Sequence, residues 1–523
     1  MRSVYYTVSL VGLAAIGLLS LVWPSSLYLL FLLVPYIAVG LYDVSSKHNV
    51  LRNYPVIGHL RYLLEFISPE IQQYFIETNQ SGRPYNRQLR SLIYQRAYKL
   101  ADTLPFGTQR DITDQGYEFA HHSLTPKKPR PDAAVVVIGG PQCDHPYRAS
   151  RLNISAMSFG ALSANAIRAM NKGARLGGFA QNTGEGGLSP YHLEFGADIV
   201  WQIGTGYFGC RTPDGRFNAD EFQRKAALDN VKMIEVKLSQ GAKPSHGGIL
   251  PAAKVSAEIA RIRGVPMGED CISPPAHPAF STPVGLLQFV ARLRELAGGK
   301  PVGFKLCVGV HREFLAICKA MLQTSLVPDF ITVDGAEGGT GAAPVEFSDN
   351  LGASTNEAVA FVHSCLVGID LRERTRIIAS GKVATGFDLI TKLALGADLC
   401  NVARPMMFAV GCIQALRCNK NTCPTGVTSQ DPRRAWAIDI ESKHLRVRNY
   451  HAATLISFLD LMRAMGCCSP DELAPSLIYR RLADGSARPY SELYTCLMPG
   501  ELLASGVHPD YVAAWDAASP EHF

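Results

Sequence analysis

The sequence predicts an α/β protein: a (β/α)8 TIM barrel with an N-terminal transmembrane helical hairpin and helical extensions. Three observations support this. Between residues 150 and 440, eight short apolar runs alternate with helix-like periods, a segment of the size of one such barrel. The segment from Val4 to Tyr42 contains no charged residue. The chain has 523 residues, enough for one large domain plus extensions.

The apolar N-terminal segment is divided by Pro24 into two halves, each close to the ~17–20 residues that cross a bilayer. Basic residues flank both ends, with Arg2 before the segment and Lys47 after it, which favours a hairpin with both ends in the cytoplasm. The alternatives are a cleaved signal peptide and a hairpin lying in the membrane interface. We expect residues 1–43 to be a multi-pass hairpin in the cell membrane, with the catalytic domain on the cytoplasmic side.

Residues 44–149 are expected to form an adaptor of helices and loops, with amphipathic character from His59 to Tyr74. The net charge of +6 is modest. Because no recognised binding motif accompanies the basic residues, nucleic acid is not an expected partner. The basic cluster is instead predicted to face anionic lipid headgroups, and it consists of Arg83, Arg87, Arg90, Arg96 and Lys99.

Eight predicted strands follow the adaptor, each ending near Gly, Ser, Asn or Lys. They are Ile154–Phe159, Gly178–Asn182, Asp198–Gly204, Met233–Ser239, Val302–Gly309, Asp329–Gly335, Arg376–Gly381 and Asp398–Ala403. The predicted helices between them are Ser163–Leu176, Asp220–Asp229, Ala252–Arg263, Pro283–Ala297, Arg312–Gln323, Thr355–Val367 and Gly386–Leu395.

Alternating strands and helices imply right-handed crossovers and a parallel sheet, here residues 150–440. A doubly wound sheet is the alternative, but it more often carries a Gly-rich fingerprint after its first strand. The G-x-G-x-x-G pattern at Gly204–Gly209 leads into a turn-like CRTPDGRF segment and is rejected as a dinucleotide site. Residues 441–523 are expected to form a helical C-terminal extension.

In a barrel, the active site lies where the strands end. Lys237 and Lys305 each lie within an apolar strand and are expected to point into the barrel mouth toward an anion. The other polar or glycine positions at strand ends are Ser158, Gly160, Asn182, Glu185, Gln240, Asp334, Ser380, Gly381 and Arg404.

Two Gly-rich loops, DGAEGGTGAAP and SGKVATGFD, follow the sixth and seventh strands. The second opens a helix whose first amides favour an anion, although glycines can also serve tight turns alone. A phosphate together with a ring whose reduced form is anionic describes FMN. Neither a G-x-S-x-G elbow nor an H-E-x-x-H helix occurs, which argues against a hydrolase.

Three of the thirteen cysteines fall within twelve residues, as C-x5-C-x4-C at Cys412, Cys418 and Cys423. A structural zinc site needs four ligands and usually a tight cysteine pair, and this run offers neither. Three thiolates suit an iron–sulfur cluster with an incomplete cubane. The alternative is three buried thiols packed as small hydrophobes.

Several motifs occur together and in order: ISAMSFGALS, QNTGEGG, KLSQGAKPSHGGILP, SPPAHPAF, DGAEGGTGAAP, SGKVATGFD and the three-cysteine run. Over residues 130–440 they resemble the FMN-binding synthase domain of glutamate synthases. The N-terminal membrane segment is closer to the stand-alone glutamate synthase-like proteins of bacteria. The resemblance implies FMN and a [3Fe-4S] cluster, and reduction of 2-iminoglutarate, formed from 2-oxoglutarate and ammonia, to glutamate.

The resemblance also implies roles for residues. Glu185 transfers a proton to the imine nitrogen, and Lys237, Arg263 and Ser281 line the oxo-acid site. The cluster ligands are Cys412, Cys418 and Cys423. The implied FMN site consists of Ser158, Lys305, Gly339 and Gly381 with the nearby Gly160, Asn182, Asp334, Gly338, Thr340, Gly341, Ser380, Lys382 and Arg404.

The sequence departs from full glutamate synthases in several respects. No glutaminase domain is expected before the barrel, and neither an FAD nor an NAD(P)H domain is expected within the chain. A ferredoxin or reductase subunit is therefore the predicted electron donor. Where the family has Gln after the double glycine, this sequence has Ile249, and His246 interrupts the same loop.

These departures leave alternatives open. In the first alternative, the chain acts on a different oxo acid or imine. In the second, it is an electron-relaying membrane subunit without amino-acid synthesis. An FMN-dependent hydroxy-acid dehydrogenase is a third reading, but it predicts a His–Arg pair at a strand end, which the sequence does not show.

Overall fold

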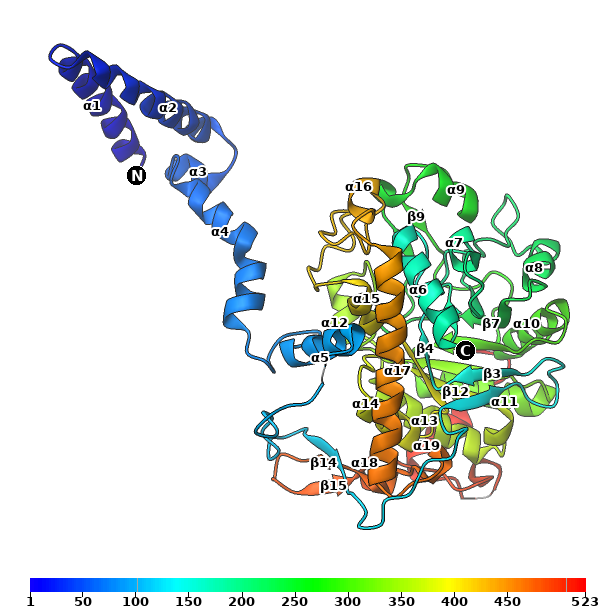
Figure 1. The fold of residues 1–523 in the computed structure, drawn as a ribbon. Coiled ribbons are helices and arrows are strands. Elements are labelled where there is room, and N and C mark those ends of the chain that lie inside the picture. Colours follow the sequence, from blue (N-terminus) through cyan, green and yellow to red (C-terminus); the bar gives the residue numbers. More distant parts are fainter. Residues whose placement is uncertain (101, 505) are drawn as a thin grey trace. The chain divides into compact units, whose positions relative to one another are not determined.

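The computed structural model describes residues 1–100, 102–504 and 506–523 (Figure 1). The chain forms two compact units, Met1–Gln88 and Leu89–Phe523, and each is described by itself. In the first unit, helix α1 (Arg2–Ser20), a 3-10 turn (Pro24–Leu29) and helix α2 (Leu30–Ser45) form an antiparallel hairpin. Tyr5 packs against Gly40 and donates from its hydroxyl to the Ile37 carbonyl across 2.7 Å.

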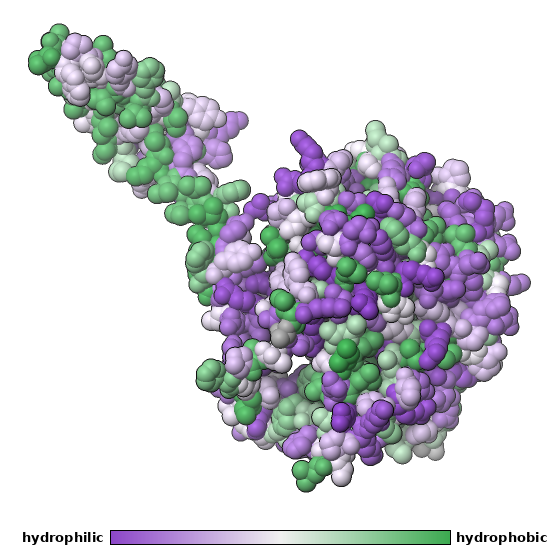
Figure 2. Space-filling model, in the orientation of Figure 1, coloured by the Kyte–Doolittle hydropathy of each residue, from purple (hydrophilic) through white to green (hydrophobic). Residues whose placement is uncertain are grey.

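Both hairpin segments are long and apolar enough to cross a membrane by length and composition, and most of their residues are exposed. Figure 2 shows hydrophobic side chains (green) over much of their surface. The unit continues with α3 (Asn49–Asn53), α4 (Gly58–Ile71) and a π-helical turn (Gln72–Ile76). Buried Asp43, at the end of α2, lies 2.8 Å from His59 of α4, which fixes the turn between the hairpin and α4.

The second unit contains a closed barrel of eight parallel strands, which confirms the predicted fold class. In barrel order the strands are β4 (Leu152–Ile154), β5 (Gln181–Asn182), β6 (Ile199–Ile203), β7 (Val231–Lys237), β10 (Val302–Leu306), β11 (Phe330–Asp334), β12 (Arg376–Ser380) and β13 (Leu399–Val402). The barrel closes where Asn401 of β13 lies opposite Asn153 of β4.

One strand prediction was wrong in its bounds. The first strand was expected at Ile154–Phe159, but β4 ends at Ile154. Gly160 has a φ of +102°, and the amide of Leu162 bonds to the Ser158 carbonyl, so the chain turns between Ser158 and Leu162. The alternation in ISAMSF therefore belongs to a loop at the barrel mouth.

Helices surround the barrel, and most begin at a Ser, Thr, Asn or Asp whose side chain accepts from a first-turn amide. They are α6 (Ala164–Gly177), α8 (Ala219–Ala226), α9 (Ala257–Arg263), α10 (Pro283–Leu296), α11 (His311–Thr324), α13 (Thr355–Gly368), α14 (Gly386–Ala394) and α15 (Arg404–Val410). The helix expected at Ala252–Arg263 is split into a 3-10 turn (Ala252–Lys254) and α9, because Ser256 caps a new helix start.

The long helix α17 (Ile440–Ala464) packs against α6, α14 and α15, so it belongs to the outer layer of the barrel (Figure 1). Shorter helices are α5 (Arg87–Tyr98), α7 (Pro190–Leu193), α12 (Val345–Asn350), α16 (Pro432–Ala435), α18 (Tyr490–Leu493) and α19 (Pro509–Ala517). The expected domain boundaries at residues 43, 149 and 440 stay predictions.

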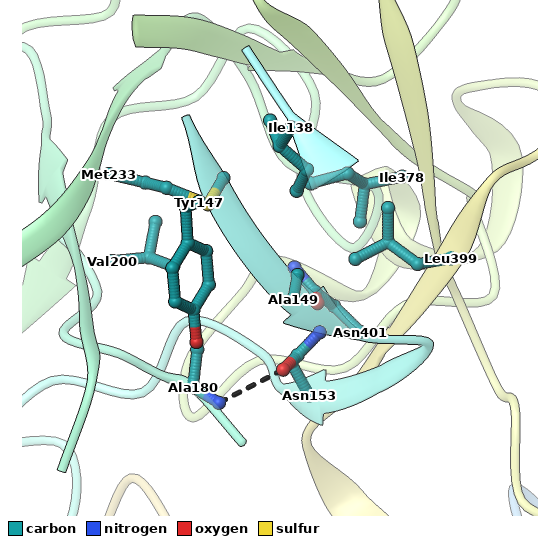
Figure 3. A pocket seen from close by; sticks show the side chains of 10 residues that line it. All are labelled: Ile138, Tyr147, Ala149, Asn153, Ala180, Val200, Met233, Ile378, Leu399 and Asn401. Carbon is teal, nitrogen blue, oxygen red and sulfur yellow. Dashed lines mark hydrogen bonds between the residues drawn. The ribbon is translucent and has the colours of Figure 1, made fainter. Parts of the chain in front are cut away.

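The end of the barrel opposite the strand carboxyl ends is filled by a hairpin that the sequence did not predict. Strands β2 (Val135–Ile138) and β3 (Tyr147–Ser150) lie within the expected helix-and-loop adaptor and pair antiparallel. Figure 3 shows Ile138 and Tyr147 among the residues that line a small apolar cavity with Met233 and Ile378. The Tyr147 hydroxyl donates to Asp198 across 2.9 Å. This end of the barrel is therefore a packed core.

A second sheet joins two segments expected to be helices or loops. Strand β1 (Glu118–Ala120) pairs with β14 (Ile478–Arg481), which pairs with β15 (Ala487–Pro489). Arg480 donates to Glu118 across 2.7 Å within this sheet. The C-terminal extension is therefore mixed in structure and not purely helical.

Candidate active site

The predicted polar ring lies at one end of the barrel, because the carboxyl ends of parallel strands share one edge. Lys237 ends β7, Asp334 ends β11, and Lys305 is the fourth residue of β10. Ser380 ends β12, and Arg404 is the first residue of α15. The loops after the strands contribute Ser158, Gly160, Glu185 and Gly381.

Lys237 and Glu185 form the central ion pair of this ring. The Lys237 Nζ lies 2.8 Å from Glu185 Oε1 and 2.5 Å from Gln240 Oε1. The side chains of Lys237 and Glu185 are 9% and 18% exposed. Gly248 approaches so closely that a Cβ there would clash with the Glu185 carboxylate. This explains why a glycine-containing loop lies beside the pair.

The charge state of Glu185 depends on its cationic surroundings. Burial works to raise the pKa of Glu185, but the ammonium of Lys237, helped by Lys243 and Arg263, outweighs burial and lowers it. The carboxyl group is therefore ionised at neutral pH, with three cations around it.

Lys243 is a site residue that the sequence analysis missed. It is 2% exposed, and burial lowers the pKa of its ammonium to about 8, with Glu185 opposing the shift and Lys237 adding to it. The signal was present, since Lys243 follows Lys237 and Gln240 in the same KLSQGAK run.

Lys305 and Asp334 form a second buried ion pair, with 3.2 Å between Nζ and Oδ2. Burial works to lower the pKa of Lys305, but Asp334 and Glu235 outweigh it and raise it, so the ammonium is retained. Asn182, predicted to bind a cofactor, uses its amide inside the barrel. It donates to Glu235 across 2.8 Å and accepts from the Gly184 amide.

The two Gly-rich loops lie next to helix starts. A Cβ at Gly381, where φ is +147°, would clash with the Thr355 hydroxyl. The Thr355 Oγ1 is buried and has no hydrogen-bond partner among the described residues. A Cβ at Gly339 would lie 2.8 Å from Arg404, whose Nη2 donates to the Glu337 carbonyl.

The remaining predicted cofactor positions follow two neighbouring strands: β11 is followed by Gly338, Thr340 and Gly341, while Ser380 ends β12 and Lys382 comes after it. At the expected anion site, Thr385 is the N-cap of α14, and the Asp388 carboxylate accepts from the amides of Ala384 and Thr385. An acidic group thus already occupies part of this helix start. The phosphate site at α14 stays a prediction.

Arg263 and Ser281 were predicted to line the oxo-acid site. Arg263 is 4% exposed and donates from Nη2 to the Phe159 carbonyl and the Ser158 hydroxyl, at 3.1 and 3.4 Å. Its Nε has no partner among the described residues. Ser281 is exposed, just before α10, and no hydrogen bond joins it to the other described site residues. The structure therefore brings Arg263 close to Glu185 and Ser158, and it shows Ser281 only as an exposed residue.

Ile249 and His246 lie in the loop that departs from the family pattern. Ile249 belongs to strand β8 (Ile249–Leu250) and lies opposite Ile272 of β9 (Cys271–Ile272). His246 packs edge-on against Phe347 of α12, with 5.3 Å between ring centroids. An aliphatic side chain at position 249 offers no hydrogen bond to a substrate.

The three cysteines follow α15, in a loop with many internal hydrogen bonds. Burial raises the pKa of Cys412 to about 12 and also raises that of Cys418. Burial works in the same direction on Cys423, but hydrogen bonds to Thr425 and Thr428 outweigh it and lower its pKa. Each thiol is close enough to another of the three for their charges to interact.

Among the residues that the structure describes, no three His, Cys, Asp or Glu side chains converge on a position for one metal ion. A cluster places each thiolate on a different iron atom, so its ligands need not converge in that way. The [3Fe-4S] cluster stays a prediction.

Fold and site together define a class: a (β/α)8-barrel protein with buried lysine–carboxylate pairs at the mouth and a cysteine loop after the last strand. The family model for the conserved region in glutamate synthase matches residues 127–468. The chain belongs to the glutamate synthase family, and it is an oxidoreductase of the class that acts on CH–NH2 donors.

Relatives of known sequence lie in bacteria and archaea. The chain is 40% identical to the glutamate synthase large subunit-like protein YerD of Bacillus subtilis, over 85% of this chain and 92% of that one. It is 35% identical to the archaeal glutamate synthase [NADPH] of Methanocaldococcus jannaschii, over 61% of this chain and 60% of that one. Among solved structures, a flavocytochrome b2 variant with pyruvate bound is 13% identical, with a TM-score of 0.44. The match covers 84% of this chain and 91% of that one.

Proposed function

We propose that this chain is a membrane-anchored FMN and iron–sulfur oxidoreductase that converts 2-oxoglutarate, through 2-iminoglutarate, to glutamate. Ammonia comes from solution or from a partner. One observation carries the proposal: three buried cations, Lys237, Lys243 and Arg263, surround the single carboxylate of Glu185. This surplus of positive charge suits a dicarboxylate substrate, since burying it without an anion is costly.

Within this site, each residue has a role in the proposed reaction. Arg263 and Lys243 bind the carboxylates of the oxo acid. Lys237 holds Glu185 in position through their 2.8 Å hydrogen bond. Because the Glu185 carboxyl is ionised, it first accepts a proton, from ammonium or from Lys237, and then delivers it to the imine nitrogen.

Three features support a fit to FMN. Lys305 supplies a permanent cation inside the mouth, where it can offset charge on a reduced ring. The glycines at 339 and 381 let the backbone of both loops pass close to Arg404 and Thr355, where a Cβ would clash with those side chains. The buried Thr355 hydroxyl without a partner among the described residues offers a hydrogen bond. When bound, FMN supplies the hydride that reduces the imine.

Cys412, Cys418 and Cys423 would hold the [3Fe-4S] cluster, which relays electrons from an external donor such as a ferredoxin or a reductase subunit. Ser158 and Gly160 in the loop after β4, and Arg404 at the start of α15, would contact the FMN. The other contacts would come from Gly338, Thr340, Gly341, Ser380 and Lys382.

The N-terminal unit is proposed to anchor the enzyme in the cell membrane, with its catalytic barrel on the cytoplasmic side. Two observations support this: the apolar lengths of α1 and α2, and the exposed apolar face of α4, which includes Leu60, Leu63 and Leu64. Alkaline carbonate extraction of a cell membrane fraction tests the anchor. Release of the full-length chain by carbonate would contradict a spanning hairpin.

A different oxo acid or imine is the second candidate substrate, because Ile249 replaces a polar side chain in the substrate loop. An electron-relaying subunit without synthesis is less consistent with the buried Lys237–Glu185 pair, which such a subunit does not need. Purified protein in detergent, reduced and then mixed with 2-oxoglutarate and ammonium, distinguishes these functions. We expect flavin reoxidation with formation of glutamate. Reoxidation by another oxo acid but not by 2-oxoglutarate would change the substrate and keep the chemistry.

A further inference from the structure

Helix α5, which precedes the barrel, packs directly against the cysteine loop. The Tyr94 hydroxyl donates to the backbone carbonyl of Cys412 across 2.6 Å. The Tyr94 ring meets Phe408 of α15 edge-on, with 5.9 Å between centroids. Helix α5 lies outside residues 127–468, the region that the family model matches. This contact therefore comes from a part of the chain that the shared family region does not include.

Arg90 lies one helical turn before Tyr94, on the same face of α5. Its side chain is 5% exposed, and its guanidinium is within electrostatic reach of the Cys412 thiol. Its Nη1 has no hydrogen-bond partner among the described residues. A buried guanidinium nitrogen without an acceptor is costly, so an anion is expected to face it.

Lys254 approaches the same loop from a different element, the 3-10 turn before α9. It is 3% exposed, and its Nζ donates to the carbonyls of Ala161 and Cys418, at 2.7 and 3.4 Å. It interacts electrostatically with the thiols of Cys418 and Cys423. Carbonyl oxygens hold the ammonium in place but do not cancel its charge. Arg90 and Lys254 thus face different cysteines of the run.

Three thiolates, four sulfides and three ferric ions carry roughly two negative charges, and a third after one-electron reduction. Two buried cations beside the ligands match that charge. A cation near a redox centre stabilises the more negative, reduced form more than the oxidised form, which raises the reduction potential.

We propose that Arg90 and Lys254 are positioning residues that neutralise the cluster and raise its reduction potential, so that α5 forms part of the electron-transfer site. This inference rests on the proposed cluster. In the step concerned, an external one-electron donor is oxidised and the cluster is reduced, with no proton transferred and no covalent bond changed. Arg90 acts beside Cys412, and Lys254 acts beside Cys418 and Cys423.

The test uses the full chain purified in detergent, with the cluster potential followed by EPR during a redox titration. Arg90→Met and Lys254→Met remove each charge, whereas Arg90→Lys and Lys254→Arg keep it. Lys99→Met just after α5 and Lys420→Met in the cysteine loop are matched controls, because both lysines are exposed and screened by solvent. Iron, sulfide and flavin contents are measured for every variant.

We expect each methionine variant to lower the midpoint potential and the charge-retaining variants to restore it. If the ratio of reduced to oxidised cluster falls tenfold at a fixed potential, the midpoint potential of this one-electron centre has fallen by about 59 mV. Both controls keep the wild-type potential.

Two results would overturn the inference alone. One is an iron-loaded methionine variant with an unchanged potential. The other is cluster loss from both the methionine and the charge-retaining variant of one residue, with flavin kept, which indicates packing and not charge. Wild-type protein without iron would overturn the proposed cluster as well.

Discussion

Lys237 and Glu185 lie 52 residues apart in the chain, yet their side-chain nitrogen and oxygen are 2.8 Å apart at the barrel mouth. Lys237 ends strand β7, and Glu185 lies in the loop after β5. Parallel strands bring these two positions to the same edge. The resulting pair keeps a carboxylate ionised in a buried site, and several expected outcomes depend on it.

Replacing Glu185 with Gln should remove the proton-transfer group while keeping its shape. We expect glutamate formation to fall by about 10²–10⁴-fold, the usual contribution of a general acid–base group, with flavin content unchanged. Steady-state rates and flavin absorbance measure the two effects. Glu313→Gln is the matched control, because Glu313 is exposed on α11. Full activity in Glu185→Gln would exclude this role.

The substrate affinity should depend on pH through Lys243. Burial lowers the pKa of this lysine to about 8, so it is charged below that pH and loses its proton above it. The KM for 2-oxoglutarate should therefore be lowest below pH 8 and rise above it, by up to about tenfold per unit. KM is measured at saturating ammonia. Lys243→Met should have a high KM that no longer changes through this pH range; a retained rise would assign the effect to another group.

Replacing Cys418 with Ser should cost the cluster while leaving the flavin. Serine keeps the size of the side chain but is a poor ligand for iron in a thiolate site. Iron and acid-labile sulfide assays with flavin absorbance measure this outcome. Cys496→Ser is the control, since Cys496 is an exposed free thiol outside the loop. Unchanged iron in Cys418→Ser would show that the ligand assignment is wrong.

Stability should depend on a buried ion pair far from the mouth. Arg294 donates to Asp329 across 2.8 Å, and Asp329 is completely buried and also accepts from the Val302 amide. Arg294→Met leaves this carboxylate without its cation, which should lower the free energy of unfolding by about 3–5 kcal/mol. Denaturant titration of the detergent-purified chain measures it. Arg292→Met, at an exposed position on α10, should change stability by less than about 1 kcal/mol.

Much of the fold was predictable because the barrel strands are short apolar runs with polar residues at their ends. Lys237, Lys305 and Asp334 were identified for that reason, and the structure places all three at the mouth. The hairpin of β2 and β3 was not predicted. Its strands are four residues each, and VVVI carries no alternation. Its role depends on a barrel end that exists only once the sheet closes.

The sequence by itself determined the barrel, its mouth residues and the cysteine run, since these depend on local periodicity and on motifs in a fixed order. Tertiary structure alone decided which of these groups meet. Lys243 lies within electrostatic reach of Glu185, and Arg90 within reach of Cys412, only because separate loops and helices come together in the folded chain. The physical reason is that electrostatic interaction depends on distance and burial in space, and neither is written in local sequence.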